Sequence, residues 1–235
     1  MTLDETMAAL EAVRSEQTKK THLRHGATEP LFGVKVADMK LIAKRTGIDH
    51  PLAKALYASG NYDACYLASH IVDDAKTTKT ELNVWVKQCV SGMLSEYAVP
   101  WCAAESRFGV EVATAWIKSP KPHIAAAGWN TFAVLVAITP DDDLDTAQLT
   151  ALLSRVGSTI HDQPNRVRYC MNGFLIAVGS YSKPLAIAAI RTAKAVGTVV
   201  IDHGDTACDT PNAVEAIHKT QARGTLIKKR KHARC

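Results

Sequence analysis

Basic side chains occur in three groups whose spacing suits contact with phosphate. In the first group, Arg166 and Arg168 come just before the apolar stretch around Met171 to Phe174. A helix beginning there would direct both guanidinium groups and free backbone N–H groups at a phosphate. The pair could equally be a solvated counterpart of Asp162. The residues alone leave both interpretations open.

The second group lies near the N-terminus. Lys40 and Lys44 are four positions apart, so on a helix they form a basic ridge on one face. Such a ridge could contact phosphates. An ordinary exposed helix face has the same pattern and is the more common case.

The third group is the C-terminal tail. Seven Lys or Arg residues and no acid lie between Ala216 and Cys235. The whole chain has 28 basic and 23 acidic residues, so without these seven the body has 21 basic residues and a net charge of −2. The tail is therefore either a solvated extension or an arm that contacts a polyanion. The candidate contacts with such a polyanion are Lys228, Lys229, Arg230 and Lys231.

The motifs of the common enzyme classes are missing. The chain has no GxSxG, Walker, HExxH or GxGxxG motif, which excludes the usual hydrolases, kinases and dehydrogenases. The acidic run 141–145 lacks the Gly and the distal Glu of a calcium loop, so it predicts a helix start. The six cysteines form no CxxC pair, and no Cys lies near His22 and His25. We therefore predict no metal site and no cofactor.

The elements that must position these residues are helices nearly throughout. Apolar residues recur at steps of three and four, which predicts about a dozen helices of ~10–15 residues. Thr2 and Glu5 have the spacing of a capping box at the first helix. Only 198–201 has the composition of a strand. No break in composition divides the chain, so we expect a single domain over residues 1–223 and a basic tail over 224–235.

Short helices with short connections are typical of a bundle or of stacked helical hairpins. Three segments combine small residues with a bulky apolar residue, at 64–68, 125–129 and 171–174. Their separation of roughly 40–60 residues is near the period of HEAT-type helix pairs. The sequence therefore favours an all-α fold, an α-solenoid of HEAT-like repeats in an armadillo-type superhelix. Trp116 and Trp129 lie in strongly apolar segments and are expected in the core.

Three stretches of the chain resemble one known family. They are Phe32 to Lys44, Trp116 to Ser119 with the helix that follows, and Val167 to Tyr181. In their order and spacing they are similar to the bacterial DNA alkylation repair family, the AlkD-like HEAT-repeat DNA glycosylases. The ending, from Gly204 through the basic tail, resembles a subgroup without established activity. The resemblance extends from about residue 30 to the end of the chain.

The resemblance implies a concave face that holds duplex DNA and an activity that releases cationic alkylated purines such as 3-methyladenine and 7-methylguanine. A carboxylate would stabilise the oxocarbenium-like sugar, and aromatic faces would add cation–π attraction. By resemblance, Trp101 and Glu105 take the catalytic positions, with Glu where the family has Asp. Phe174 takes the position of a later Trp, directly after Asn172 and Gly173, so Asn172 and Phe174 are candidate DNA contacts.

One position departs strongly from the family. Its essential Arg corresponds to Ala126, and this chain has no Arg between Arg107 and Arg155. Three functions therefore stay open: a glycosylase, a non-catalytic DNA-binding module, and a scaffold for protein or RNA. The longest candidate apolar run, 132–138, is too short to cross a bilayer, and the acidic start lacks a secretory signal. We expect a cytoplasmic monomer with reduced cysteines. Its expected partner is duplex DNA, and the family resemblance implies that this DNA is alkylated.

Overall fold

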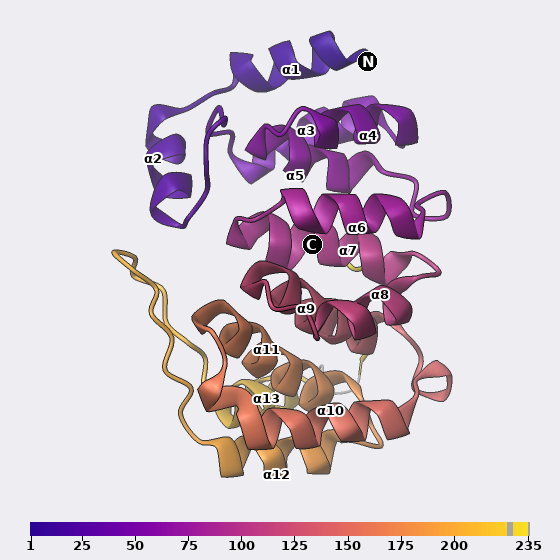
Figure 1. The fold of residues 1–235 in the computed structure, drawn as a ribbon, viewed down its shortest axis with the longest axis vertical. Coiled ribbons are helices and arrows are strands. Elements are labelled where there is room, and N and C mark those ends of the chain that lie inside the picture. The colour runs from indigo at the N-terminus through magenta and orange to yellow at the C-terminus, as the bar shows by residue number, and fades with distance from the viewer. Residues whose placement is uncertain (225–227, 235) are drawn as a thin grey trace.

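The computed structural model describes residues 1–224 and 228–234, and the regular structure in this part consists of helices (Figure 1). A π-helix, η1 (Leu94–Ala98), runs directly into α7, and two short 3₁₀ helices, η2 (Asp141–Asp143) and η3 (Ile160–Asp162), flank α10. The α-helices are α1 (Leu3–Ala12), α2 (Glu16–Arg24), α3 (Val36–Thr46), α4 (His50–Ala58), α5 (Tyr62–Ile71), α6 (Lys79–Gln88), α7 (Val99–Glu105), α8 (Gly109–Trp116), α9 (Pro122–Ile138), α10 (Thr146–Thr159), α11 (Asn165–Tyr181), α12 (Ala186–Val196) and α13 (Ala213–Ala222).

The helices stack as hairpins along the long axis of the molecule (Figure 1). Helices α4 and α5, α8 and α9, and α11 and α12 pack in pairs. One row, which we call the inner row, consists of α3, α5, η1 with α7, α9, α11 and α13, and each member contacts the next. The predicted all-α stack of helical hairpins is thus confirmed.

Small residues allow the close packing of α8 against α9, as the sequence predicted. A Cβ atom added to Gly128 would lie 2.6 Å from the backbone nitrogen of Ile117, so only glycine permits this approach. Trp129 follows directly and is completely buried. Trp116 is also buried, and its indole nitrogen donates to the side-chain oxygen of Asn83 at 2.9 Å. Both tryptophans therefore lie in the core, as predicted.

The ends of several helices are set by residues that favour helix starts or stops. Thr2 and Glu5 form the predicted capping box, with Glu5 N–H donating to Thr2 Oγ1 at 3.1 Å and Thr2 N–H to Glu5 Oε2 at 2.9 Å. Gly47 follows the end of α3 at a φ of +72°, in the region that favours glycine. Pro100 lies near the start of α7, directly after the π-helix η1, and the chain stays helical across it.

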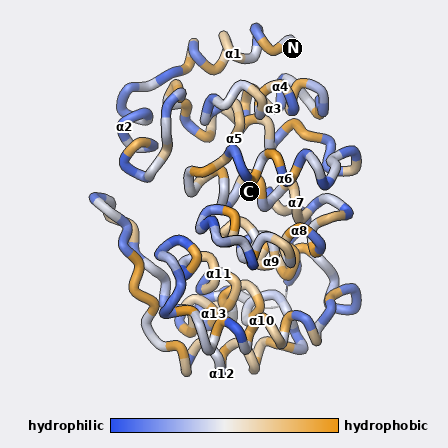
Figure 2. The backbone as a smooth tube through the Cα atoms, viewed as in Figure 1, coloured by the Kyte–Doolittle hydropathy of each residue, from blue (hydrophilic) through white to orange (hydrophobic). Residues whose placement is uncertain are grey.

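Two expectations differ from the structure. Helix α2 was not predicted, because it has no buried residue and therefore no apolar period; Figure 2 shows it as largely hydrophilic. The strand predicted at 198–201 is wrong. These residues begin an extended segment, 197–212, which projects from the body without strand pairing (Figure 1). Val199 packs into the body while Val200 is exposed, so β-branched residues here serve local packing only.

Candidate nucleic-acid interface

A cleft of about 830 Å³ lies between α2 and the projecting segment 197–212. Its floor is formed at the N-terminal ends of α5, α9 and α11 and along η1. Helices α9 and α11 begin without a side-chain cap. Their first N–H groups and the positive ends of their helix dipoles therefore favour an anionic ligand here.

The lining of the cleft is rich in nitrogen donors. It includes Arg24 and Arg166 with four histidines, against the acids Glu96 and Asp202; the histidines are His22, His25, His123 and His203. Two half-buried aromatic residues, Tyr97 and Tyr169, also contribute. The combination of cations with aromatic faces suits phosphates and bases together.

Arg166, a predicted DNA contact, is held rigidly at this cleft. Its Nε and Nη2 donate to the two carboxylate oxygens of Glu96 at 2.6 and 2.5 Å. Burial raises the pKa of Glu96, and Arg166 opposes that shift. The guanidinium also lies 4.4 Å from the ring centre of Tyr169. With its side chain 38% exposed, Arg166 is a fixed cation that still faces the ligand space.

Two of the histidines have free hydrogen-bonding capacity. Burial lowers the pKa of both His22 and His123, so both are neutral at pH 7. Within the part of the chain that the structure describes, His123 Nε2 is buried without a hydrogen-bond partner and could bind a polar atom of a ligand. His22 Nδ1 also makes no hydrogen bond, but it lies 3.9 Å from Oδ1 of Asp63.

Two predicted contacts in the middle of α11 are placed differently. Phe174 is completely buried between Trp129 and Phe132, with ring centres 5.4 and 6.5 Å away. Asn172 is also buried, and its Nδ2 donates to the carbonyl of Pro211 at 2.9 Å, which anchors the projecting segment. Neither has the exposed surface that DNA contact requires, because the middle of α11 is packed against α9 and α13.

Arg168 is directed toward the start of its own helix. Its Nη1 donates to the carbonyl of His161 at 3.5 Å, and its Nη2 donates to Asn165 Oδ1 at 3.4 Å. It does not line the cleft with Arg166. The two arginines that looked equivalent in the sequence therefore have different surroundings.

Lys40 and Lys44 are both exposed on α3, in the helical spacing that the sequence predicted. Burial lowers the pKa of His70 on α5 to about 4, and the charges of Arg234 and Lys40 add to this effect. Lys40 is therefore close enough to α5 for its charge to act on His70. Its contact with phosphate stays a prediction.

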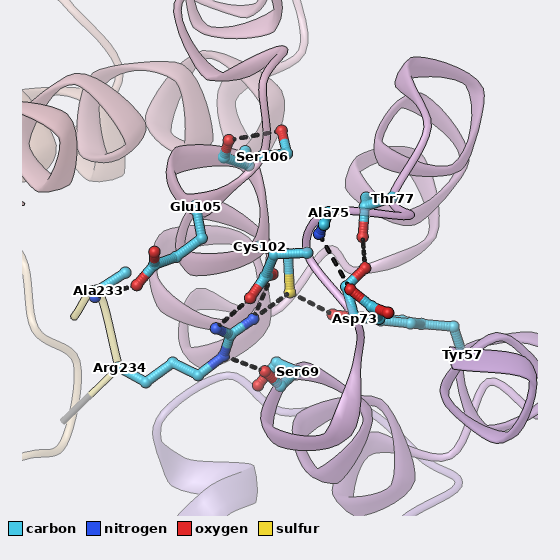
Figure 3. A network of polar contacts seen from close by, with 12 residues as sticks. Tyr57, Ser69, Asp73, Ala75, Thr77, Cys102, Glu105, Ser106, Ala233 and Arg234 are labelled. Carbon is cyan, nitrogen blue, oxygen red and sulfur yellow. Dashed lines mark hydrogen bonds and ion pairs between the residues drawn. The ribbon is translucent and has the colours of Figure 1, made fainter. Parts of the chain in front are cut away.

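Trp101 and Glu105 share one face of α7, as their spacing requires. Trp101 is buried, and its ring lies 5.9, 5.8 and 6.2 Å from those of Tyr66, His70 and Tyr97. Glu105, the last residue of α7, accepts the backbone N–H of Ala233 at 2.7 Å through Oε1 (Figure 3). Ala126, at the position of the family's Arg, is completely buried in α9. The Glu105 carboxylate, on a half-buried residue, is thus in contact with the C-terminal segment of the chain.

The C-terminal segment 228–234 packs against the body instead of extending from it. Arg234 Nη1 and Nη2 donate to the two oxygens of Asp74, both at 2.6 Å. Its Nε donates to the carbonyl of Ser69 (Figure 3). Burial raises the pKa of Asp74, and Arg234 opposes this. Lys229 forms an ion pair with Asp141 at 2.8 Å. Cys235 lies outside the described residues.

These contacts divide the four tail cations predicted to bind DNA. Lys229 and Arg230 are partly buried against the body, and the N–H of Arg230 donates to the carbonyl of Ala137 at 2.8 Å. Lys228 and Lys231 are exposed.

Sequence reasoning missed Asp63. This carboxylate on α5 is completely buried and accepts the N–H groups of Phe32, Gly33 and Val34 at 2.6, 3.0 and 2.9 Å. Residues 32–34 begin the first stretch that resembled the family, and they wrap around this acid. An acid within an apolar helix was the only signal, and its distant backbone partners could not be read from it.

A family model described as "DNA alkylation repair enzyme" matches residues 6–217. The chain belongs to this DNA alkylation repair family. Two uncharacterized relatives are Lin0241 of Listeria innocua, 30% identical, and Lmo0209 of Listeria monocytogenes, 29% identical; each match covers 95% of this chain and 99% of the relative. No helix in the described part of this family member is long and apolar enough to cross a membrane.

One solved structure matches the whole of both chains with a TM-score of 0.92 and 36% identity. It is described as belonging to "a new family of proteins related to the HEAT-like repeat DNA glycosylases with affinity for branched DNA structures". The HEAT-like solenoid expected from the sequence is confirmed by this match. The resemblance to the DNA alkylation repair family is confirmed as well.

Proposed function

We propose that this protein binds branched DNA in the cleft between α2 and segment 197–212, as a single chain. The lining of the cleft is the observation that carries the proposal. It combines Arg24, the fixed Arg166, and the half-buried rings of Tyr97 and Tyr169. The affinity of the similar solved protein for branched DNA supports this choice of ligand.

The chemistry of the cleft fits a branch point better than a continuous duplex. At a branch, bases are exposed and can stack on aromatic side chains, which contributes about 1–3 kcal/mol per base. Arginine side chains and the N-terminal ends of α9 and α11 would hold the phosphates around that point. A linear duplex offers the same phosphates but no unstacked base.

Excision of alkylated purines is the alternative activity within this family, and three features argue against it. No guanidinium is available at Ala126, Trp101 has almost no exposed surface, and Glu105 is bonded to Ala233. Release of a purine would need a carboxylate that faces the sugar. The proposal is therefore binding without excision.

Fluorescence anisotropy with a labelled four-way junction, a three-way junction and a linear duplex tests the proposal. We expect the junctions to bind about 10-fold or more tightly, the gain from one or two stacked bases. Tyr169→Ala should remove most of this preference. Arg191→Ala, on the exposed side of α12, is the matched control and should bind like wild type. Equal affinity for junctions and duplex would exclude branch recognition.

A second arm measures release of 7-methylguanine from methylated DNA. We expect no release above the rate without protein. Release that is lost in Glu105→Gln would instead establish the glycosylase reading, with Glu105 as its carboxylate.

A further inference from the structure

The C-terminal segment 228–234 covers a row of carboxylates. Asp74 and Asp141 each lie three residues beyond the end of an inner-row helix, α5 and α9, and Glu105 ends α7 between them. All three are contacted by the segment: Asp74 by Arg234, Glu105 by the N–H of Ala233, and Asp141 by Lys229. We call these three residues the acidic strip.

The segment also binds the carbonyl ends of the same helices. Arg234 donates to the carbonyl of Ser69 in the last turn of α5, and Lys229 donates to that of Val136 near the end of α9, at 2.9 Å. The N–H of Arg230 reaches the next carbonyl, Ala137. Carbonyls at a helix C-terminus lack partners and carry partial negative charge, so cations are favoured here. The contacts are therefore matched in both hydrogen bonding and charge.

The charge balance shows what the segment changes. The acidic strip has three carboxylates, and residues 228–234 contain five Lys or Arg side chains. Without the segment, this end of the inner row would present a charge of −3. With the segment in place, the same area carries +2, and the exposed Lys228 and Lys231 belong to it.

The strip lies across the inner row from the cleft, because the cleft floor is formed at the N-terminal ends of α5 and α9 and the strip lies at the C-terminal ends of α5, α7 and α9. Tyr97 lines the cleft, and its ring lies 6.2 Å from that of Trp101. Trp101 in turn packs against His70, whose pKa is lowered in part by the charge of Arg234. Glu105 lies eight positions after Tyr97, a rise of about 12 Å along a helix. A DNA arm that leaves the cleft and crosses the inner row along α7 would therefore meet the strip at Glu105.

We propose that the docked C-terminal segment is a built-in part of the DNA-binding surface. It neutralises the acidic strip, presents Lys228 and Lys231 to the phosphates of one DNA arm, and keeps Glu105 covered. Arg234 is the positioning residue that fastens the segment through Asp74. This inference rests on the proposed binding of branched DNA.

The test compares junction affinity and its salt dependence in Arg234→Ala, Asp74→Asn with Arg234→Ala, and the control Arg191→Ala. Loss of Arg234 exposes Asp74 and loosens the segment, so we expect about 10-fold weaker binding at ~50 mM salt and a log–log slope lower by about 2. Removing the Asp74 charge as well should recover part of the affinity. Absence of recovery would mean that the exposed Asp74 does not repel the DNA, which would contradict the proposed neutralisation of the acidic strip.

Tighter or unchanged binding by Arg234→Ala would overturn the proposal; tighter binding would identify the segment as a competitor of DNA. If circular dichroism shows that Arg234→Ala is unfolded, the exposed pair Lys228→Ala with Lys231→Ala replaces it. That variant should lower the slope by about 2, and an unchanged slope would overturn the proposal. Failure of the proposed function looks different, because wild type itself would then show no preference for junctions.

Discussion

Asp63 organises the chain between α2 and α3 through a single carboxylate. Asp63→Asn keeps the shape but removes the charge from three hydrogen bonds to backbone N–H groups. Because charged hydrogen bonds are strong and the stranded N–H groups are buried, we expect a loss of at least about 2 kcal/mol in the free energy of unfolding, measured by urea titration. Asp142→Asn, at an exposed acid, should change it by less than about 0.5 kcal/mol. Equal effects would mean that Asp63 has no special role.

His70 predicts a dependence of stability on pH. Its pKa in the folded protein is lowered from 6.5 to about 4, chiefly by burial, so between these values the unfolded chain binds more protons. The contribution of neutral His70 to the free energy of unfolding is complete above pH 6.5 and is lost as the pH falls toward 4. Urea titrations at pH 7 and pH 5 should show lower stability at pH 5. His70→Gln should reduce the difference in stability between pH 7 and pH 5. An unchanged difference would show that His70 is not the source of this pH dependence.

At the scale of the helix, two glycines on inner-row helices make opposite predictions. A Cβ at Gly128 would lie 2.6 Å from the backbone nitrogen of Ile117, directly after α8, whereas a Cβ at Gly173 would meet nothing within 4 Å. Gly128→Ala should therefore destabilise the protein by roughly 1–3 kcal/mol through forced separation of α8 and α9. Gly173→Ala should stabilise it by about 0.5–1 kcal/mol, because alanine favours the helix. Thermal unfolding of both variants checks the pair, and the same sign for both would mean that the α8–α9 contact is not close.

At the scale of the whole molecule, the placement of charge predicts how DNA binding responds to salt. Several phosphates should contact the cleft and the C-terminal segment, so affinity for a junction should fall between about 50 and 200 mM salt with a log–log slope above ~3. Arg24→Ala removes one cation of the cleft and should reduce the slope by about 1. Arg191→Ala removes an equal charge from α12 and should leave it unchanged. A slope near zero would exclude the phosphate backbone as the ligand.

The sequence by itself determined most of the helices, because helix formation follows local patterns. The capping box of Thr2 and Glu5, the stop at Gly47 and the small residues around Gly128 all act within a few positions or within one hairpin. The buried Trp116 and Trp129 followed from apolar periodicity. Helix α2 was missed for the same reason: without a buried residue it has no such period. The family could also be predicted, because its stretches follow one another in order along the chain.

The candidate site depended on contacts between residues that are far apart in the chain, and only the tertiary structure decided those. Phe174 has an aromatic side chain suited to DNA, but α9 and α13 pack against its helix and bury it. The cleft exists because α2 and segment 197–212, more than 170 residues apart, project over the same helix ends. From the sequence alone, the tail has the composition of a free basic arm. In the structure, Arg234 and Lys229 form ion pairs with Asp74 and Asp141, which lie 160 and 88 positions earlier. Charge and hydrophobicity are properties of a residue, whereas exposure and ion pairing depend on which distant surfaces the fold brings together.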